Sequence, residues 1–85
     1  MEIFYTVKFS REAKKLPLSL RPVVEERLAI FKLDHFDPKL KTHKLSGALE
    51  GYWSFSITHK VRIIFRFDGP KTALFHSIGD HSIYV

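Results

Sequence analysis

Two arginines and two histidines have side chains and spacing suited to acid–base chemistry on a phosphate. Arg62 and Arg66 lie four residues apart in residues 61–67, where the odd-numbered positions are all apolar. Successive side chains of a strand point to opposite faces, so both arginines should share the face opposite to the apolar one. Arginine binds phosphate through paired hydrogen bonds, and His43 and His81 could exchange protons near neutral pH. These side chains would suit RNA cleavage without a metal, which needs a base, a cation beside the phosphate and an acid for the leaving oxygen.

Each of these residues also has a purely structural interpretation. Arg62 could pair with a nearby carboxylate on a solvated strand, and His81 could be an ordinary surface residue. His43 lies in the basic run 41–44, which could cradle a phosphate or form a solvated loop. Glu50 could act as a base or only cap the turn that follows it, so the general base is either His43 or Glu50. The other histidines are assigned structural positions: His35 after a helix, His59 in a hairpin turn and His76 within a strand.

Basic and aromatic residues around these candidates suit contacts with a polynucleotide. Contacts with the RNA backbone are expected from Lys39, Lys41, Lys44 and Arg66. Two aromatic residues, Trp53 and Tyr84, could stack on bases. Trp53 shares the parity of Phe55 and Ile57, so a core position is its alternative, whereas Tyr84 is expected in a free tail.

Length and composition bound the class of protein. The chain has 85 residues, so residues 1–85 are predicted to fold as a single domain. A net charge of +5 favours a polyanion or an acidic protein as partner. There is no cysteine, which excludes disulfides and thiolate zinc sites, and no histidine pair has the spacing of a metal-binding helix. We therefore expect no metal and no other cofactor.

Hydropathy bears on location. No apolar run approaches the roughly 20 residues that cross a membrane, and the first residues lack the basic and apolar segments of a signal peptide. The sequence therefore predicts a cytoplasmic protein with no membrane partner.

Hydrophobic periodicity predicts the elements that position these residues. Residues 3–9 alternate as a strand, Ser10 is expected to cap a short helix, and Pro17 should end that helix. A second helix, capped by Ser19, should run to about Leu33. Three β stretches follow, at 52–57, 61–67 and 72–78.

The order of these elements predicts an α+β fold, β-α-α-β-β-β. Short turns make the last three strands antiparallel neighbours, and the two helices should form a hairpin packed on one face of a mainly antiparallel sheet. The apolar set of residues 61–67 must face the helices, so the two arginines should project from the opposite, open face.

Four short motifs resemble the RelE/ParE toxin superfamily in their order and spacing. In one-letter code they read THKLSG at 42–47, GYWS at 51–54, VRIIF at 61–65 and IGDH at 78–81. The resemblance covers nearly the whole chain. It implies a compact toxin with a β-α-α-β-β-β core that a small antitoxin neutralises. Many members cleave mRNA in the ribosomal A site without a metal, whereas the ParE-like branch inhibits DNA gyrase.

The resemblance also implies roles for single residues. Arg62 matches the strand arginine of YoeB-like ribonucleases, His81 matches the C-terminal histidine of YoeB-like and YafQ-like members, and His43 matches an upstream histidine of YafQ-like members. The chain departs from these patterns at Ser56 and Lys60, where YafQ-like members carry a histidine and an acid.

Three functions follow as hypotheses. The first is a ribosome-dependent mRNA endonuclease whose partners are the ribosome, mRNA and an acidic antitoxin, with no small-molecule cofactor. The alternative is a gyrase inhibitor without nuclease activity, in which Arg62 and His81 would be dispensable. The last is an inactive toxin-like module that only binds RNA.

Overall fold

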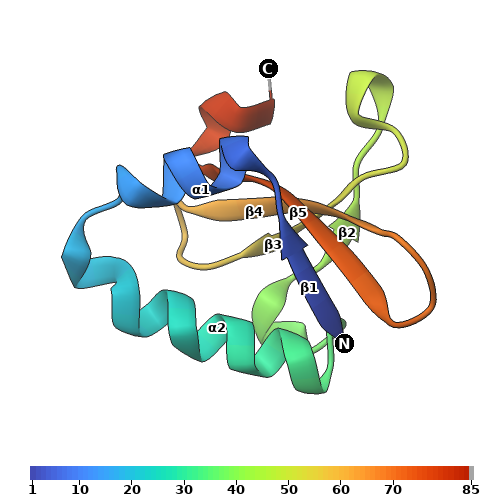
Figure 1. The fold of residues 1–85 in the computed structure, drawn as a ribbon, viewed down its shortest axis with the longest axis horizontal. Helices are drawn as coiled ribbons and strands as arrows, with labels where there is room; N and C mark the ends of the chain where they lie inside the picture. Colours follow the sequence, from blue (N-terminus) through green and yellow to red (C-terminus); the bar gives the residue numbers. More distant parts are fainter. Residues whose placement is uncertain (85) are drawn as a thin grey trace.

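The structure, a computed structural model, describes residues 1–84 and contains one five-stranded sheet with two α-helices (Figure 1). The elements are β1 (Glu2–Tyr5), α1 (Val7–Lys14), α2 (Arg21–Leu33), β2 (His43–Lys44), β3 (Trp53–Ser56), β4 (Arg62–Phe67) and β5 (Thr72–Gly79). Short 3₁₀ helices lie between them, and a last one, η4 (His81–Tyr84), follows β5. No described helix is both long and apolar enough to cross a membrane.

The strands run in the order β1-β5-β4-β3-β2. β1 pairs with β5 in parallel, and every other pairing is antiparallel. The predicted α+β fold is thus confirmed. The two-residue strand β2, which pairs with the start of β3, is an addition to the predicted order.

The first strand is shorter than its alternation predicts. It ends at Tyr5, and Thr6 rather than Ser10 caps α1, because the Thr6 hydroxyl accepts a hydrogen bond from the Phe9 amide at 2.9 Å. The alternating pattern of residues 3–9 is therefore only half a strand. Phe9 is buried from the first turn of a helix instead.

A cluster of phenylalanines joins α2 to the sheet. Phe31 of α2 is fully buried, and its ring centroid lies 4.8 Å from that of Phe55, 5.1 Å from that of Phe65 and 5.3 Å from that of Phe75. Aromatic rings at such distances stabilise a core beyond the area that they bury. This cluster fixes which face of the sheet is covered. The other side chains of β3, β4 and β5 must then point away from α2.

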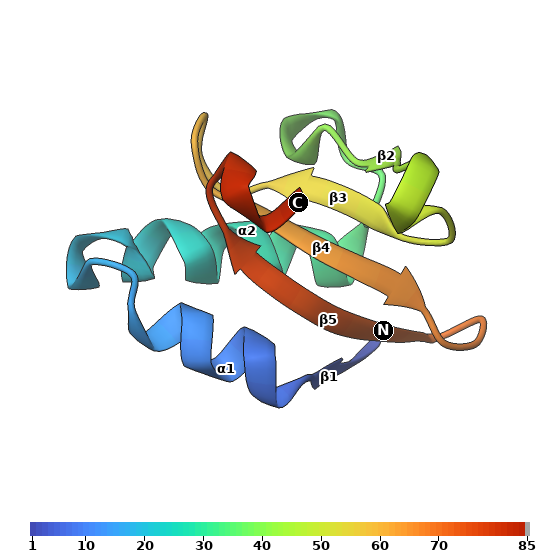
Figure 2. The same ribbon diagram turned by 90° about the horizontal axis from the view of Figure 1, so that it is seen from above.

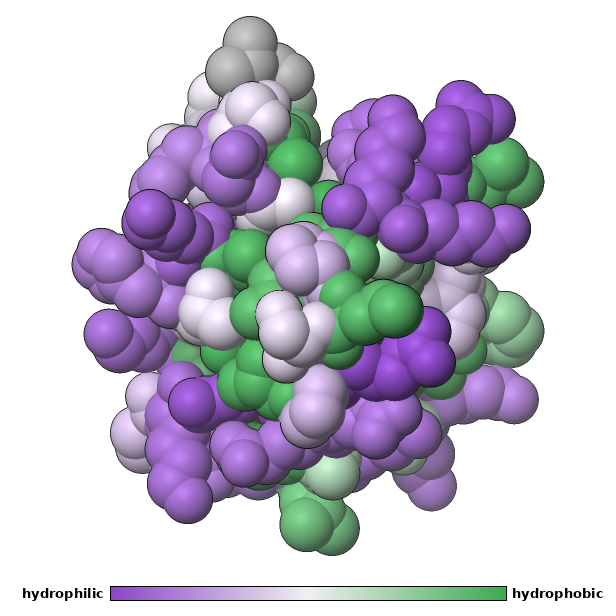
Figure 3. All heavy atoms as spheres, turned by 90° about the vertical axis from the view of Figure 1, so that its left-hand side faces the viewer, coloured by the Kyte–Doolittle hydropathy of each residue, from purple (hydrophilic) through white to green (hydrophobic). Residues whose placement is uncertain are grey.

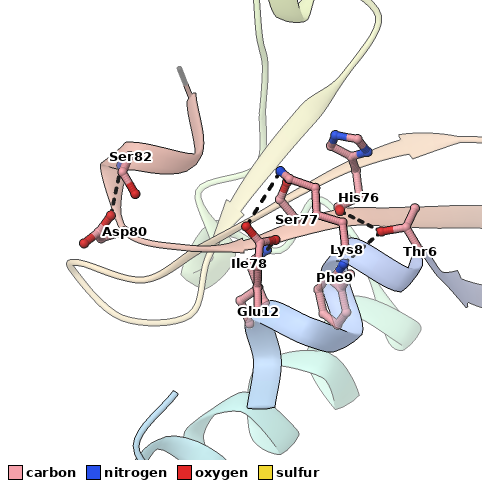
Figure 4. Close-up of polar contacts among 9 residues, drawn as sticks. All are labelled: Thr6, Lys8, Phe9, Glu12, His76, Ser77, Ile78, Asp80 and Ser82. Carbon is pink, nitrogen blue, oxygen red and sulfur yellow. Dashed lines mark hydrogen bonds and ion pairs between the residues drawn. The ribbon is translucent and has the colours of Figure 1, made fainter. Parts of the chain in front are cut away.

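α1 covers the second half of β5, which extends beyond the end of β1 and has no described strand partner on that edge. β1 pairs with β5 only as far as Phe75, and α1 continues along the rest of that edge (Figure 2). The Glu12 carboxylate accepts a hydrogen bond from the Ile78 amide at 3.3 Å, and the Thr6 hydroxyl donates to the His76 carbonyl at 2.8 Å (Figure 4). Side chains of the helix thus replace the missing strand partner.

Candidate functional site

The side of the sheet away from α2 carries two rows of paired residues, and we call it the open face. One row runs His43, Ser54, Ile64 and Ser77 across β2, β3, β4 and β5. The next row runs Ser56, Arg62 and Gly79. Directly paired residues share a face of the sheet, so His43 and Arg62 lie on the same side, in neighbouring rows.

Arg62 lies at the start of β4 and is half-buried. Its Nη1 donates a hydrogen bond of 2.7 Å to the hydroxyl of Ser56. Among residues 1–84 the ion pairs are Lys8–Glu12 and Arg27–Glu26, so no described carboxylate neutralises Arg62. A guanidinium has five N–H donors, and those not used by Ser56 remain for an anion.

The C-terminal segment folds back over the open face as η4, on the opposite side of the strands from α2 (Figure 2). The Tyr84 hydroxyl lies 2.7 Å from the Ser54 hydroxyl, so Tyr84 is anchored, and the expectation of a free tail is wrong. The His81 ring centroid lies 5.7 Å from that of Tyr84. η4 therefore holds His81 beside an anchored residue.

Asp80 organises the turn into η4. Its carboxylate accepts a hydrogen bond from the Ser82 amide at 2.9 Å (Figure 4). Its carbonyl accepts one from the Ile83 amide at 3.1 Å. The hydrogen bonds from Ser82 hold the pKa of the Asp80 carboxyl below its usual range. The carboxylate form that caps this turn is thus the favoured one.

Two serines contact these residues: Ser54, which the sequence did not single out, and Ser56, which it marked only as a departure from the YafQ-like pattern. Ser54 and Ser56 are two residues apart on the same face of β3; one contacts Tyr84 and the other contacts Arg62. Ser54 is 0% exposed and Ser56 is 9% exposed. The sequence signal that could have identified them is the alternation of serine with aromatic residues along β3.

His43 is exposed, and its ring is oriented by the backbone. Its Nδ1 lies 2.9 Å from the Lys41 carbonyl. A carbonyl only accepts, so Nδ1 carries the proton, and in the neutral ring Nε2 is left as the proton acceptor. Lys41 has a positive φ of 53°, a conformation rare for residues other than glycine, and it places its carbonyl in reach of the ring.

Glu50 is not brought next to Arg62. It lies exposed in the loop before β3, whereas Ser56, the partner of Arg62, lies at the other end of that strand. Trp53 to Ser56 alone spans about 10 Å at the usual rise of a strand. His43 shares the open face with Arg62, but β3 lies between their strands, so about 10 Å of sheet separates them as well.

The predicted RNA contacts are divided between the two faces. Arg66 is exposed on the open face, whereas Lys39 and Lys41 are exposed in the segment before β2, where the Lys39 carbonyl accepts a hydrogen bond from Arg27 of α2. Lys44 lies with its ammonium 5.5 Å from the ring centroid of Trp53. Trp53 in turn packs on Phe36 and Phe67, on the side of the sheet that faces α2.

No metal centre is formed by the part of the chain that the structure describes, because no three histidine, aspartate or glutamate side chains come together there.

A groove separates the two helices. It has a volume of about 330 Å³ and is lined mostly by apolar side chains of α1, α2 and the turn between them. Leu18 is 77% exposed beside it, and Lys14 and Arg21 contribute positive charge. Figure 3 shows a hydrophobic patch in the middle of this side of the molecule, surrounded by hydrophilic side chains.

Comparison of the whole fold finds bacterial toxins. The YoeB/ParE toxin from Agrobacterium tumefaciens superimposes with a TM-score of 0.78 at 20% identity, over 95% of this chain and 99% of that one. YafQ from E. coli matches with a TM-score of 0.71 at 18% identity, over 98% of this chain and 96% of that one. A heterotetrameric YoeB-YefM toxin-antitoxin complex from Staphylococcus aureus matches with a TM-score of 0.75 at 20% identity, over 95% and 97% of the two chains.

These likenesses show that the chain has the fold of YoeB and YafQ, and the resemblance inferred from sequence motifs is confirmed at that level. Neither a scan against family models nor a search of curated proteins finds a match.

Proposed function

We propose that this chain is the toxin of a type II toxin-antitoxin system and that it cleaves mRNA on the ribosome without a metal. The observation that carries the proposal is Arg62, which has no described carboxylate partner on the open face; His43 shares that face, and η4, which carries His81, folds over it. The fold shared with YoeB and YafQ supports the toxin role.

We assign one step of the reaction to each of the three side chains. His43 Nε2 removes the proton of a 2′-hydroxyl, and that oxygen attacks the adjacent phosphorus. Arg62 stabilises the negative charge that builds on the phosphate oxygens. His81 donates a proton to the departing 5′-oxygen. The products are a 2′,3′-cyclic phosphate and a 5′-hydroxyl, and the proton taken by His43 balances the one given by His81.

The partners follow from charge and from the helix groove. The net charge of +5 suits binding to rRNA and mRNA. Because translation takes place in the cytoplasm, the proposed function places the protein there. The groove suits an antitoxin segment with an apolar face and acidic flanks, because Lys14 and Arg21 border an apolar floor. The complexes of similar proteins with YefM and DinJ support a partner of this kind.

The test is growth after induction, combined with primer extension on a translated mRNA. We expect wild type to arrest growth and to leave discrete cuts within codons. Arg62→Ala, His81→Ala and His43→Ala should each reduce cutting by roughly a hundredfold, the usual cost of losing one group that stabilises a transition state.

Two control variants separate the site from general effects. Arg21→Ala removes an exposed arginine from the helix on the other side of the sheet, and Glu50→Ala removes the competing base. Both should cut as wild type does, and thermal unfolding should show that all variants fold. Arrest without cuts would contradict the nuclease and favour gyrase inhibition. Absence of arrest would favour a module that only binds RNA.

A further inference from the structure

His76 leaves the regular pairing of β5. Ile64 pairs with Ser77, while the next residue of β4, Phe65, pairs with Phe75. One residue of β5, His76, therefore has no partner on β4, which is the definition of a β-bulge. Bulges re-aim side chains, and here both His76 and Ser77 belong to the open face. In Figure 4 the His76 ring points away from both helices.

Tyr52 meets His76 across β4. The two ring centroids lie 5.2 Å apart with an angle of 47° between the planes, although Tyr52 precedes β3 and His76 belongs to β5. Both side chains are only half-buried. Ile64, which lies between these strands on the same face, is 0% exposed. The two half-buried rings thus form an aromatic pair on the open face.

Positive charge surrounds this pair of rings. Lys8 donates a hydrogen bond of 2.9 Å to the hydroxyl of Ser77, the neighbour of His76, and Arg66 projects from β4 on the same face. Partial burial first, and Lys8 and Arg66 after it, lower the pKa of His76, while Glu12 acts in the opposite direction. The imidazole is therefore held neutral at neutral pH, and a neutral ring stacks without adding a charge.

We propose that Tyr52 and His76 form a stacking platform for one base of the RNA substrate. The proposal rests on the proposed function and names a subsite of the same face. Proteins bind single-stranded RNA by combining aromatic rings under the bases with cations along the backbone. Arg66, which has no described carboxylate partner, supplies the cation here, and Lys8 stands beside the rings already paired with Glu12.

The platform recognises a base away from the cleaved bond. Arg62 and Arg66 are four residues apart on β4, about 13 Å at the rise of a strand. Neighbouring stacked bases are separated by about 3.4 Å. The base on the platform is therefore several steps from the phosphate at Arg62. It holds the RNA in register, and its contribution is to binding and not to the proton transfers.

The test measures binding of short RNA by fluorescence anisotropy to the full chain. The probe is a single-stranded decamer whose 2′-hydroxyls are methylated so that it cannot be cleaved. A series of such decamers each lacks one base. We expect wild type to lose affinity roughly tenfold when the base over the platform is missing, since stacking on one aromatic residue contributes about 1–3 kcal/mol.

Matched variants assign that loss to the two rings. Tyr52→Ala and His76→Ala should bind the intact decamer roughly tenfold more weakly and should no longer distinguish the decamer without the base. Tyr52→Phe and His76→Phe keep a ring and should behave as wild type, as should His59→Ala, which removes an exposed histidine from a hairpin turn. Thermal unfolding identifies any variant that fails to fold.

The outcomes separate this proposal from the nuclease. Arg62→Ala should lose cutting and keep its response to the missing base. Any of three results would overturn the platform. The alanine variants could bind like wild type, wild type could fail to respond to any missing base, or wild type could fail to bind the decamer. A platform without cleavage would overturn the nuclease alone.

Discussion

At the scale of single residues, His76 makes the fold sensitive to acid. An unfolded histidine has a pKa of about 6.5. In the fold, partial burial and the nearby Lys8 lower the pKa of His76, and Arg66 adds to the effect. Between these two pKa values the unfolded chain binds more protons, so the free energy of unfolding falls as the pH decreases below about 6.5. Below the folded pKa this particular loss is complete.

His76→Gln should therefore make the fall in stability on acidification shallower in this window. Lys8→Met should act in the same direction, because it removes one cause of the lowered pKa. The measurement is urea denaturation at a series of pH values from 7.5 to 4.5. If His76→Gln follows the wild-type curve throughout, the histidine is not responsible for the acid response.

The role of His76 shows the limit of strand alternation as a predictor. The positions of Arg62 and Arg66 on the open face follow from the apolar residues between them, and the structure agrees. His76 has the parity of both Leu74 and Ile78, yet Leu74 pairs with Arg66 on the open face while Ile78 lies in the core. The bulge at His76 shifts the alternation of side chains between the two faces by one residue, and nothing in the local sequence marks it.

At the scale of elements, η4 depends on the absence of a side chain at Gly79. A Cβ atom at this position would lie 2.7 Å from Cγ2 of Ile83, closer than two carbon atoms can approach. In Gly79→Ala the Ile83 side chain must shift, and we expect η4 to move with it and the contact between Tyr84 and Ser54 to weaken. We expect cutting to fall by roughly a hundredfold, the effect of about 1 Å of misplacement in a catalytic group.

The sheet should remain folded in this variant, because one hydrogen bond contributes only about 1 kcal/mol. Ile83→Ala removes the colliding atom, so the double variant Gly79→Ala with Ile83→Ala should recover much of the activity. Primer extension measures the cutting, and circular dichroism follows the fold. Loss of cutting that Ile83→Ala does not relieve would mean that Gly79 acts in another way.

Elements were predictable in proportion to their length. The long helix α2 ends at Leu33, where its periodicity ends, and the three antiparallel strands lie where alternation places them. β2 and η4 have two and four residues, too few for any period to show. β2 forms because its backbone pairs with β3, and η4 fits because Gly79 leaves room for Ile83. The sequence therefore could not reveal how His43 and Tyr84 reach the same face.

At the scale of the whole molecule, the helix groove and the open face are distinct surfaces. The groove lies between α1 and α2, whereas the open face lies on the side of the sheet away from α2 (Figure 3, Figure 1). A small domain buries a limited core, so an exposed apolar groove lowers solubility without improving the fold. The antitoxin segment proposed above would cover this apolar surface.

Leu18 is the side chain that tests this partner. It is 77% exposed beside the groove, and Leu33 of α2 is 90% exposed and does not line it. Burial of a leucine contributes about 1.5–3 kcal/mol, so Leu18→Glu should weaken binding of the acidic antitoxin by about tenfold or more, while Leu33→Glu should not. Both sites are exposed, so neither change should unfold the chain.

The measurement is isothermal titration calorimetry with a synthetic helical peptide that has an apolar face and acidic flanks, the chemistry proposed for the antitoxin segment. Lys14→Glu should slow association and make it less sensitive to salt, because that lysine attracts the acidic flanks before contact. Cutting by Leu18→Glu should continue when the antitoxin is added, since the variant keeps the open face intact and escapes its inhibitor. Equal weakening by Leu18→Glu and Leu33→Glu would show that general surface hydrophobicity, and not the groove, binds the antitoxin.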